Sequence, residues 1–488
     1  MHLHLIAPRM SRRPMDSDWK LRMSPPLALL TVAALTPPEH RVTLNDENIE
    51  RTRCKLRPDL VGLSVKADTF ARACELAAYW RQRGVPVVFG GIHPTACPDD
   101  CAPFADSLVI GEAEPVWAAL LADVAAGRMR PRYQATAPAD MATVPPPRWE
   151  LLRAGKYLFT NTLTISRGCP WQCDFCYSSS PNLPRGHRVK PVGSILDEIR
   201  ALGTDHVMFI DDNFIGSPSR TRELVAALAP LGLTWHAAVS ADIGQRLDLL
   251  DAMAAAGCQS LFIGFETVNQ ASLRDCRKTQ NRVAAYDALL NEIHARGLMV
   301  NASIVFGFDA DGPEVFADTV DWLERNRVAT MTAHILTPYP GTRLHARLLA
   351  EGRIVERDLR RYNTAYAVFH PARMNAAELE SGYRWAYQRF YSWRSIWRRQ
   401  PEAAAQRTAF WEFNLLYRKF GKLTCWAGRL LGMRNMAKLA CATAYPSAVS
   451  RAWKNFADFF QGSEKIPRVL PMPGKTALPV FQSLENKT

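Results

Sequence analysis

Three cysteines fall within eight residues of one predicted loop, and their spacing could hold a metal centre. Cys169, Cys173 and Cys176 form a C-x3-C-x2-C pattern just after an apolar run. A structural zinc site needs a fourth Cys or His at a similarly short spacing. The next candidate, His187, lies in a Pro/Gly-rich loop and does not meet that need. A cubane iron–sulfur cluster held by three thiolates would keep one iron free for an outside ligand.

The cysteine pattern, with Phe175 just before its last member, resembles the signature of the radical S-adenosylmethionine (SAM) superfamily. The resemblance implies a 4Fe-4S cluster on Cys169, Cys173 and Cys176, whose open iron chelates the amino and carboxylate groups of SAM. It also implies that Phe175 packs beside the adenine. Zinc binding, or a chance grouping of cysteines, is the alternative.

A partial (β/α)6 barrel over residues 159–345 would position this loop, because β and helical patterns alternate there. The predicted strands are Asn161–Ser166, His206–Asp211, Thr234–Ser240, Ser260–Thr267, Met299–Phe306 and Met331–Leu336. The helices expected between them are Val192–Leu202, Arg222–Leu231, Asp248–Ala256, Val283–Arg296 and Pro313–Asn326. Active sites of such barrels lie at the carboxyl ends of the strands.

Several of these strand ends carry residues suited to SAM. Asp211 and Asp212 could accept hydrogen bonds from its ammonium group, and we expect one of the two to cap the following helix. Glu266 could hold the ribose hydroxyls, since Gly264-Phe265-Glu266 followed by Lys278 and Asn281 resembles the cobalamin-linked subgroup of the superfamily. Gly307 would leave room for the adenine, and Tyr339 is a weak catalytic candidate. For each of them a packing or capping role is the alternative.

Residues 1–135 predict a separate doubly wound α/β domain. Short β patterns at His2–Ala7, Arg41–Leu44, Leu60–Val65, Pro86–Gly90 and Ser107–Ile110 alternate with helical ones. Such sheets bind ligands at the carboxyl ends of their strands. The turns expected there resemble those of the cobalamin-binding domain that precedes many radical SAM barrels. The resemblance implies that cobalamin contacts Ser64, Gly90, Gly91, His93, Gly111 and Glu112. No D-x-H-x-x-G loop follows the first strand, so a domain that only packs on the barrel is the alternative.

The remainder divides into a linker, a helical segment and a tail. Four prolines between residues 136 and 158 oppose regular structure. Residues 346–460 read as a helical domain, and residues 461–488 as a loose Pro/Lys-rich tail.

No apolar run is long enough to span a membrane, and the N-terminus lacks a signal-peptide pattern, which predicts a cytoplasmic protein. Eleven cysteines in such a chain favour reduced thiols and a metal site.

Most of the net charge of +13 lies in residues 381–460, which hold 14 Lys/Arg against three acids. Aromatic residues are interleaved with these cations. A helical cover over the barrel mouth, with arginines reaching water, explains this mixture. Peripheral contact with an anionic membrane surface explains it as well. We expect no nucleic-acid binding, because no RNA-binding module pattern accompanies the segment.

The resemblance covers residues 1 to about 345 and is to cobalamin-dependent radical SAM enzymes of the kind that includes hopanoid methylases and the anaerobic magnesium-protoporphyrin cyclase. It implies reductive SAM cleavage, fed by a flavodoxin- or ferredoxin-type donor, and methyl transfer to an unactivated carbon of a small apolar intermediate, such as a lipid or tetrapyrrole. A radical oxidoreductase or cyclase, a methylthiotransferase and a metal-dependent binding module are the alternatives. The methylthiotransferase would need a second cluster and a terminal RNA-binding β-domain, which the sequence does not show.

Overall fold

The structure, a computed structural model, describes residues 1–14 and 20–418. These residues belong to one compact unit, Met1–Ala448. The described residues form two six-stranded sheets and one two-stranded antiparallel ribbon. No described helix is long and apolar enough to cross a membrane.

The N-terminal sheet is parallel throughout, with strand order β2-β1-β3-β4-β5-β6. Its strands are β1 (His2–Ala7), β2 (Arg41–Asp46), β3 (Leu60–Ser64), β4 (Val87–Gly90), β5 (Ser107–Ile110) and β6 (Arg132–Gln134). Its helices are α1 (Leu27–Leu35), α2 (Phe70–Arg81), α3 (Ile92–Ala96), α4 (Pro98–Cys101) and α5 (Trp117–Ala125). The predicted strands are thus present, and α1, α3, α4 and β6 were missed.

Two hydrophobic cores cover the two faces of this sheet. Leu3 and Leu5 of β1 pack with α1 and α5, whereas Ile6 packs with α2. The alternation follows from the period of two along a strand. A parallel sheet buried on both faces, with its strand order reversing beside β1, is the doubly wound arrangement.

The second sheet is also parallel, with order β14-β13-β12-β11-β10-β7. Its strands are β7 (Thr162–Leu163), β10 (His206–Phe209), β11 (Thr234–Ser240), β12 (Cys258–Glu266), β13 (Met299–Phe306) and β14 (Thr330–Ile335). The helices between them are α6 (Val192–Leu202), α7 (Pro218–Leu228), α8 (Leu247–Ala255), α9 (Gln270–Asp275), α10 (Tyr286–Ala295) and α11 (Val315–Arg325). The six predicted strands and five predicted helices are present, and α9 is additional.

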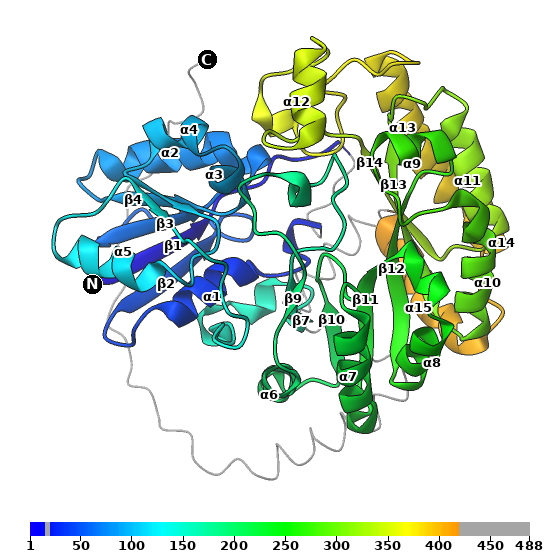
Figure 1. Cartoon of the computed structure of the whole chain (residues 1–488), viewed down its shortest axis with the longest axis horizontal. Coiled ribbons are helices and arrows are strands. Elements are labelled where there is room, and N and C mark those ends of the chain that lie inside the picture. The colour runs from blue at the N-terminus through cyan, green and yellow to red at the C-terminus, as the bar shows by residue number, and fades with distance from the viewer. Residues whose placement is uncertain (15–19, 419–488) are drawn as a thin grey trace, which may run out of the picture. The chain divides into compact units, whose positions relative to one another are not determined.

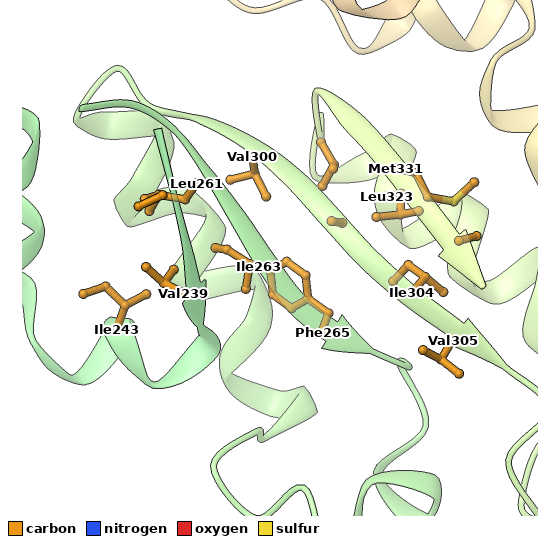
Figure 2. Close-up of a cluster of buried hydrophobic side chains, with 14 of the residues drawn as sticks. Val239, Ile243, Leu261, Ile263, Phe265, Val300, Ile304, Val305, Leu323 and Met331 are labelled. Carbon is orange, nitrogen blue, oxygen red and sulfur yellow. The ribbon is translucent and has the colours of Figure 1, made fainter. Parts of the chain in front are cut away.

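Among the described residues, helices pack on only one face of the barrel sheet (Figure 1). Leu261, Ile263 and Phe265 of β12 point into this core, together with Val300 and Ile304 of β13 (Figure 2). The residues between them face the other way, and Phe262 remains 37% exposed. Closed (β/α)8 barrels fill their interior with side chains, so an accessible inner face suits an open barrel that receives a ligand.

The first barrel strand differs from the prediction. Residues Asn161–Ser166 were expected to form one strand, but β7 ends at Leu163. Ser166–Arg167 then form β8, which pairs in antiparallel fashion with β9 (Arg188–Val189) outside the main sheet. The chain leaves the ladder because the Asp211 carboxylate accepts the backbone N–H groups of Ile165 and Ser166. This β8–β9 hairpin encloses the cysteine loop.

The C-terminal helices do not cover the barrel mouth as one unit. They are α12 (Arg343–Ala350), α13 (Ala376–Phe390), α14 (Trp393–Arg398) and α15 (Ala404–Tyr417). Arg343 on α12 donates to Gln172 at 2.8 Å, which places α12 beside the cysteine loop. In contrast, α13 packs on α11 and β14, and the Arg399 guanidinium binds the carbonyls of Val328 and Ala329, just before β14 begins. The described part of α14–α15 therefore lies at the amino end of β14. The remainder of residues 381–460, and the predicted tail, lie outside the described residues.

Candidate active site

The cysteine loop is held at the carboxyl end of the barrel sheet. Asp174 N–H donates to the carbonyl of Cys276 at 3.0 Å, and Leu344 N–H donates to the carbonyl of Asp174 at 2.9 Å. Cys173 is buried, Cys169 is half-buried and Cys176 is exposed. The loop is thus anchored on both sides while one thiol remains open to an incoming group.

The donor set fits an iron–sulfur cluster. Burial raises the pKa of Cys169 to about 11 and also raises the pKa of Cys173. The charges of neighbouring cysteines of the loop raise both pKa values further, which shows that the thiols are close together. In the part of the chain that the structure describes, no three His, Cys, Asp or Glu side chains converge tightly enough to share one metal ion. Ligands of a cubane each bind a different iron, so they need not converge in that way.

Buried polar atoms without partners surround this loop. The oxygens Tyr177 Oη, Gln280 Oε1 and Asp211 Oδ2 have no hydrogen-bond partner among the described residues, and neither has Trp171 Nε1. Buried polar groups are normally satisfied. These four atoms, in or beside the loop, could therefore be satisfied by polar groups of a ligand.

Asp211 and Asp212 have different roles. Asp211 is buried, and its Oδ1 accepts Ile165 N–H at 3.0 Å and both Ser166 N–H and Ser166 Oγ–H at 2.6 Å. Burial raises its pKa to about 7. Asp212 is exposed and close enough to influence the pKa of Cys169. The expected helix cap is wrong for both, because α7 begins after Ser217. Asp211 shapes the loop, and Asp212 remains available to a ligand.

Glu266 is already paired inside the protein. Its carboxylate accepts a hydrogen bond from Lys278 Nζ at 2.5 Å, and both side chains are buried. Burial alone would lower the pKa of Lys278, but the Glu266 charge raises it above the ordinary value. Glu266 has a left-handed φ of 65° at a register shift in β12. Such backbone strain in a non-glycine residue is typical of functional sites. The Lys278 charge also acts on Cys173, which places this pair beside the loop.

The other predicted contacts are only partly brought together. Phe175 packs edge-on against Phe308 at 6.0 Å between ring centroids, so it does reach the end of β13. Gly307 has a φ of 105°, and a Cβ there would meet Leu379 of α13 at 2.7 Å. Glycine at this position is thus explained by packing. Tyr339 stacks on Tyr177 at 5.1 Å, directly beside Cys176.

A cavity of about 340 Å3 lies at the carboxyl ends of the N-terminal strands. Its walls include Ser64, Gly90, Gly91, Gly111 and Glu112, together with apolar side chains of α1 and β5. Gly111 has a φ of 85°, and a Cβ added there would meet open space. The glycine-lined, largely apolar cavity fits part of a corrinoid.

Two of the predicted cavity residues behave differently. His93 does not line the cavity; it is fully buried against Phe70 at 4.8 Å, and burial lowers its pKa to about 4. Glu112 lines the cavity, but its carboxylate is already bound by Arg188 and Arg167. These features support a packing role for His93 and a bridging role for Glu112.

Some site residues were missed by sequence reasoning. Gln280 donates to Cys173 Sγ at 3.8 Å, and Lys190 forms a buried ion pair with Glu198 on the cavity wall. Arg167 and Arg188 bind the turn that follows β5. Only Arg167 had a local signal, because it precedes the first cysteine by two residues.

Comparison with known proteins agrees with this arrangement. The model of the radical SAM superfamily matches residues 163–323, and that of the B12 binding domain matches residues 25–121. The hopanoid C-2 methylase of Rhodopseudomonas palustris is 30% identical over 71% of this chain and 68% of its own length. This chain belongs to the radical SAM superfamily. Within it, the chain is a cobalamin-dependent enzyme of the methyltransferase group, and its cofactors are a 4Fe-4S cluster, SAM and cobalamin.

Other relatives have related names. The bacteriochlorophyllide d C-12(1)-methyltransferase of Chlorobaculum tepidum is 29% identical over 82% of this chain and 89% of its own length. The anaerobic magnesium-protoporphyrin IX monomethyl ester cyclase of Rubrivivax gelatinosus is 23% identical over 71% of this chain and 68% of its own. Both names refer to tetrapyrroles.

Solved structures share the fold. The cobalamin-dependent SAM radical enzyme OxsB has a TM-score of 0.64 at 15% identity and covers 94% of this chain and 81% of its own. The methyltransferase TsrM of Kitasatospora setae has a TM-score of 0.58 at 17% identity and covers 80% of this chain and 81% of its own. The expected α/β class with a cobalamin-binding domain, a radical SAM barrel and a helical C-terminus is confirmed.

Proposed function

We propose that this cobalamin-dependent radical SAM methyltransferase methylates an unactivated carbon of a small, mainly apolar biosynthetic intermediate, and that a tetrapyrrole is the preferred class. The inner face of the barrel sheet carries the proposal. Phe262 and Ile210 are 37% and 42% exposed on that face, beside the half-buried polar residues Ser260, Asn301 and Thr332. A flat molecule with an apolar ring and polar edges would suit such a surface.

Bound cofactors would supply reductive cleavage of SAM, removal of a substrate hydrogen and a transferable methyl group. The residues proposed for the cluster are Cys169, Cys173 and Cys176. Asp212 is proposed to accept a hydrogen bond from the SAM ammonium, and Phe175 to pack against its adenine. Asp211 would hold the start of the loop in place. Tyr177 and Tyr339, stacked beside Cys176, would form one wall of the substrate site. Reduction by a flavodoxin- or ferredoxin-type protein is part of this proposal.

An anaerobic assay tests the proposal. Reconstituted enzyme is mixed with SAM, a reductant, cobalamin and bacteriochlorophyllide d, and the products are followed by mass spectrometry. We expect a product heavier by one CH2, with S-adenosylhomocysteine and 5′-deoxyadenosine formed together. Formation of 5′-deoxyadenosine with an oxidised or cyclised product, and without S-adenosylhomocysteine, would favour the cyclase alternative. Equal methylation of a hopanoid would remove the preference for tetrapyrroles.

Contact with an anionic membrane surface is a second part of the proposal. Trp393 and Trp397 on α14 are exposed, with Trp411 at 5.3 Å from Trp397 and the exposed cations Arg394 and Arg398 beside them. Tryptophan and arginine on one face are typical of surfaces that bind the lipid–water interface. We refer to these five residues as the tryptophan patch.

A further inference from the structure

A set of ion pairs connects the cofactor cavity to the start of the cysteine loop. Arg188 Nη2 lies 2.5 Å from Glu112 Oε1, and Arg167 Nη1 lies 3.3 Å from the same oxygen. Arg167 also pairs with Glu114. Glu112 and Glu114 belong to the turn after β5, whereas the two arginines belong to the β8–β9 hairpin. We call these four residues the bridging network.

The network offsets a repulsion that the hairpin would otherwise contain. Arg167 and Arg188 are direct partners in the β8–β9 register, so their side chains leave the same face of the ribbon. Like charges placed opposite each other in antiparallel strands destabilise the pairing. Glu112 and Glu114 supply two negative charges for the two positive ones. Without them, this two-residue pairing would be expected to open.

The neighbouring contacts make the network more than a surface feature. Glu112 Oε2 accepts the N–H of Ala139 at 2.6 Å, and Arg188 donates to the carbonyl of Ala139 at 2.8 Å. The network thus also fixes the linker between the two sheets. Arg167, Glu112 and Glu114 line the cavity, while Arg167 is separated from Cys169 only by Gly168.

We propose that Glu112, Glu114, Arg167 and Arg188 are positioning residues that fix the first cluster cysteine relative to the cobalamin cavity. This inference rests on cobalamin occupying that cavity, and it does not depend on the identity of the methyl acceptor. A methyl group and a substrate radical must meet at one carbon, so the two cofactors need a defined separation. A misplacement of about 1 Å can cost about a hundredfold in rate.

The test measures the relation between the two centres directly. The full chain is loaded with cobalamin and the 4Fe-4S cluster, and both are reduced to paramagnetic states, so that their magnetic coupling reports their separation in pulsed EPR. For the wild type we expect one well-defined coupling. For Glu112→Gln and for Arg188→Gln we expect the distribution of distances between the two centres to be at least about twofold broader. The iron and cobalamin contents of both variants should be unchanged. Arg188→Lys, which keeps the positive charge, should narrow this distance distribution again in part.

Asp123→Asn is the matched control, because Asp123 pairs with Arg128 and Arg130 in the same N-terminal domain, away from the hairpin. It should behave as the wild type. An unchanged coupling in both Glu112→Gln and Arg188→Gln would overturn the inference. Loss of both centres from Arg188→Gln would also overturn it, because a general folding role explains that result. The assay needs no methyl acceptor, so a wrong substrate assignment cannot produce either outcome.

Discussion

The three cysteines make the most direct prediction at the scale of single residues. Replacing Cys169, Cys173 or Cys176 by Ala should abolish the visible charge-transfer absorbance of the reconstituted cluster and the cleavage of SAM, because each thiolate binds a different iron. Cys258→Ala is a suitable control, since Cys258 is buried at the start of β12. Cys54, Cys74 and Cys276 should be dispensable as well, and so should Cys425 and Cys441, which lie outside the described residues. Tight zinc without iron-dependent cleavage would contradict the cluster assignment.

Glu266 needs a more careful substitution than alanine. Glu266→Ala would leave the buried Lys278 charge without its partner and should destabilise the fold by about 3 to 5 kcal/mol. Glu266→Gln keeps the shape and a hydrogen-bonding oxygen. We expect it to weaken SAM binding by about 1.5 to 3 kcal/mol in equilibrium binding measurements, if Glu266 receives a charge-assisted hydrogen bond from the ribose.

Glu324→Gln is the control, because Glu324 pairs with the partly exposed Arg389 at 2.5 Å on the helical side of the barrel. It should leave SAM affinity unchanged. Unchanged SAM affinity in Glu266→Gln would assign the carboxylate to structure alone.

His93 predicts a pH dependence of stability. Its pKa is lowered to about 4 in the fold by burial, whereas an unfolded histidine titrates near 6.5. The unfolded chain therefore binds more protons between these values, so the contribution of His93 to stability is lost as the pH falls through this range. His93→Phe, which keeps the ring contact with Phe70, should gain about 2 kcal/mol relative to the wild type between pH 7 and pH 5.

Urea unfolding of both proteins at the two pH values measures this difference. If the free energy of unfolding changed equally with pH in both proteins, a group other than His93 would cause the pH dependence. Full retention of cobalamin by His93→Phe would support the packing role, and its loss would restore the sequence-based assignment of His93 to the cofactor.

At the scale of elements, Arg399 joins the C-terminal helices to the barrel. Its buried guanidinium donates to the carbonyls of Val328, Ala329 and Phe390 at 2.7 to 2.9 Å and stacks on the Phe390 ring. Arg399→Met should lower the free energy of unfolding by about 3 kcal/mol or more, since the buried carbonyls of Val328 and Phe390 lose their donor, whereas that of Ala329 keeps Asn414 Nδ2. Thermal unfolding of the variant and the wild type would measure this loss. Arg398→Met, at the exposed neighbouring residue, is the control and should have little effect on stability.

Most of the strands and helices could be predicted from the hydrophobic pattern of the sequence. β1, β5, β11 and β13 begin and end at the predicted residues, because mainly buried apolar runs bounded by turns leave little freedom in register. Helix α1 was missed because Leu27–Leu35 is apolar on all sides and shows no helical period. The β8–β9 hairpin was missed because a two-residue pairing has no pattern, and its partner strand lies about twenty residues away in the sequence.

Candidate site residues could be named from the sequence where they belong to short motifs. The cysteine pattern, the glycine turns of the cavity and Glu266 are of this kind, and their contacts with cofactors stay predictions. The role of Asp211 was not predictable, because its partners Ile165 and Ser166 are 46 and 45 residues away in the sequence. Its carboxylate takes the place of strand–strand hydrogen bonds instead of capping a helix. The same holds for Glu112, whose arginine partner Arg188 is 76 residues away.

At the scale of the whole molecule, the tryptophan patch predicts salt-sensitive vesicle binding. The full chain should sediment with anionic vesicles more than with neutral ones, and the difference should shrink at 1 M salt, where the Debye length is about 3 Å. Trp393→Ser with Trp397→Ser should weaken binding, whereas Trp385→Ser, on an exposed face of α13, is the control. Point substitutions are preferable to ending the chain near residue 380, because truncation would also remove Arg399. Equal sedimentation of both variants would remove the membrane argument.

The location of the tryptophan patch has a further consequence. α14 and α15 lie at the amino end of β14, and the cysteine loop lies at the opposite, carboxyl end of the sheet. An enzyme resting on a bilayer through this patch would direct its reactive opening toward the aqueous side. A substrate embedded in the leaflet could not diffuse sideways into it and would first have to be extracted. The rate of methylation of a membrane-embedded substrate should then not rise with the area of lipid surface supplied.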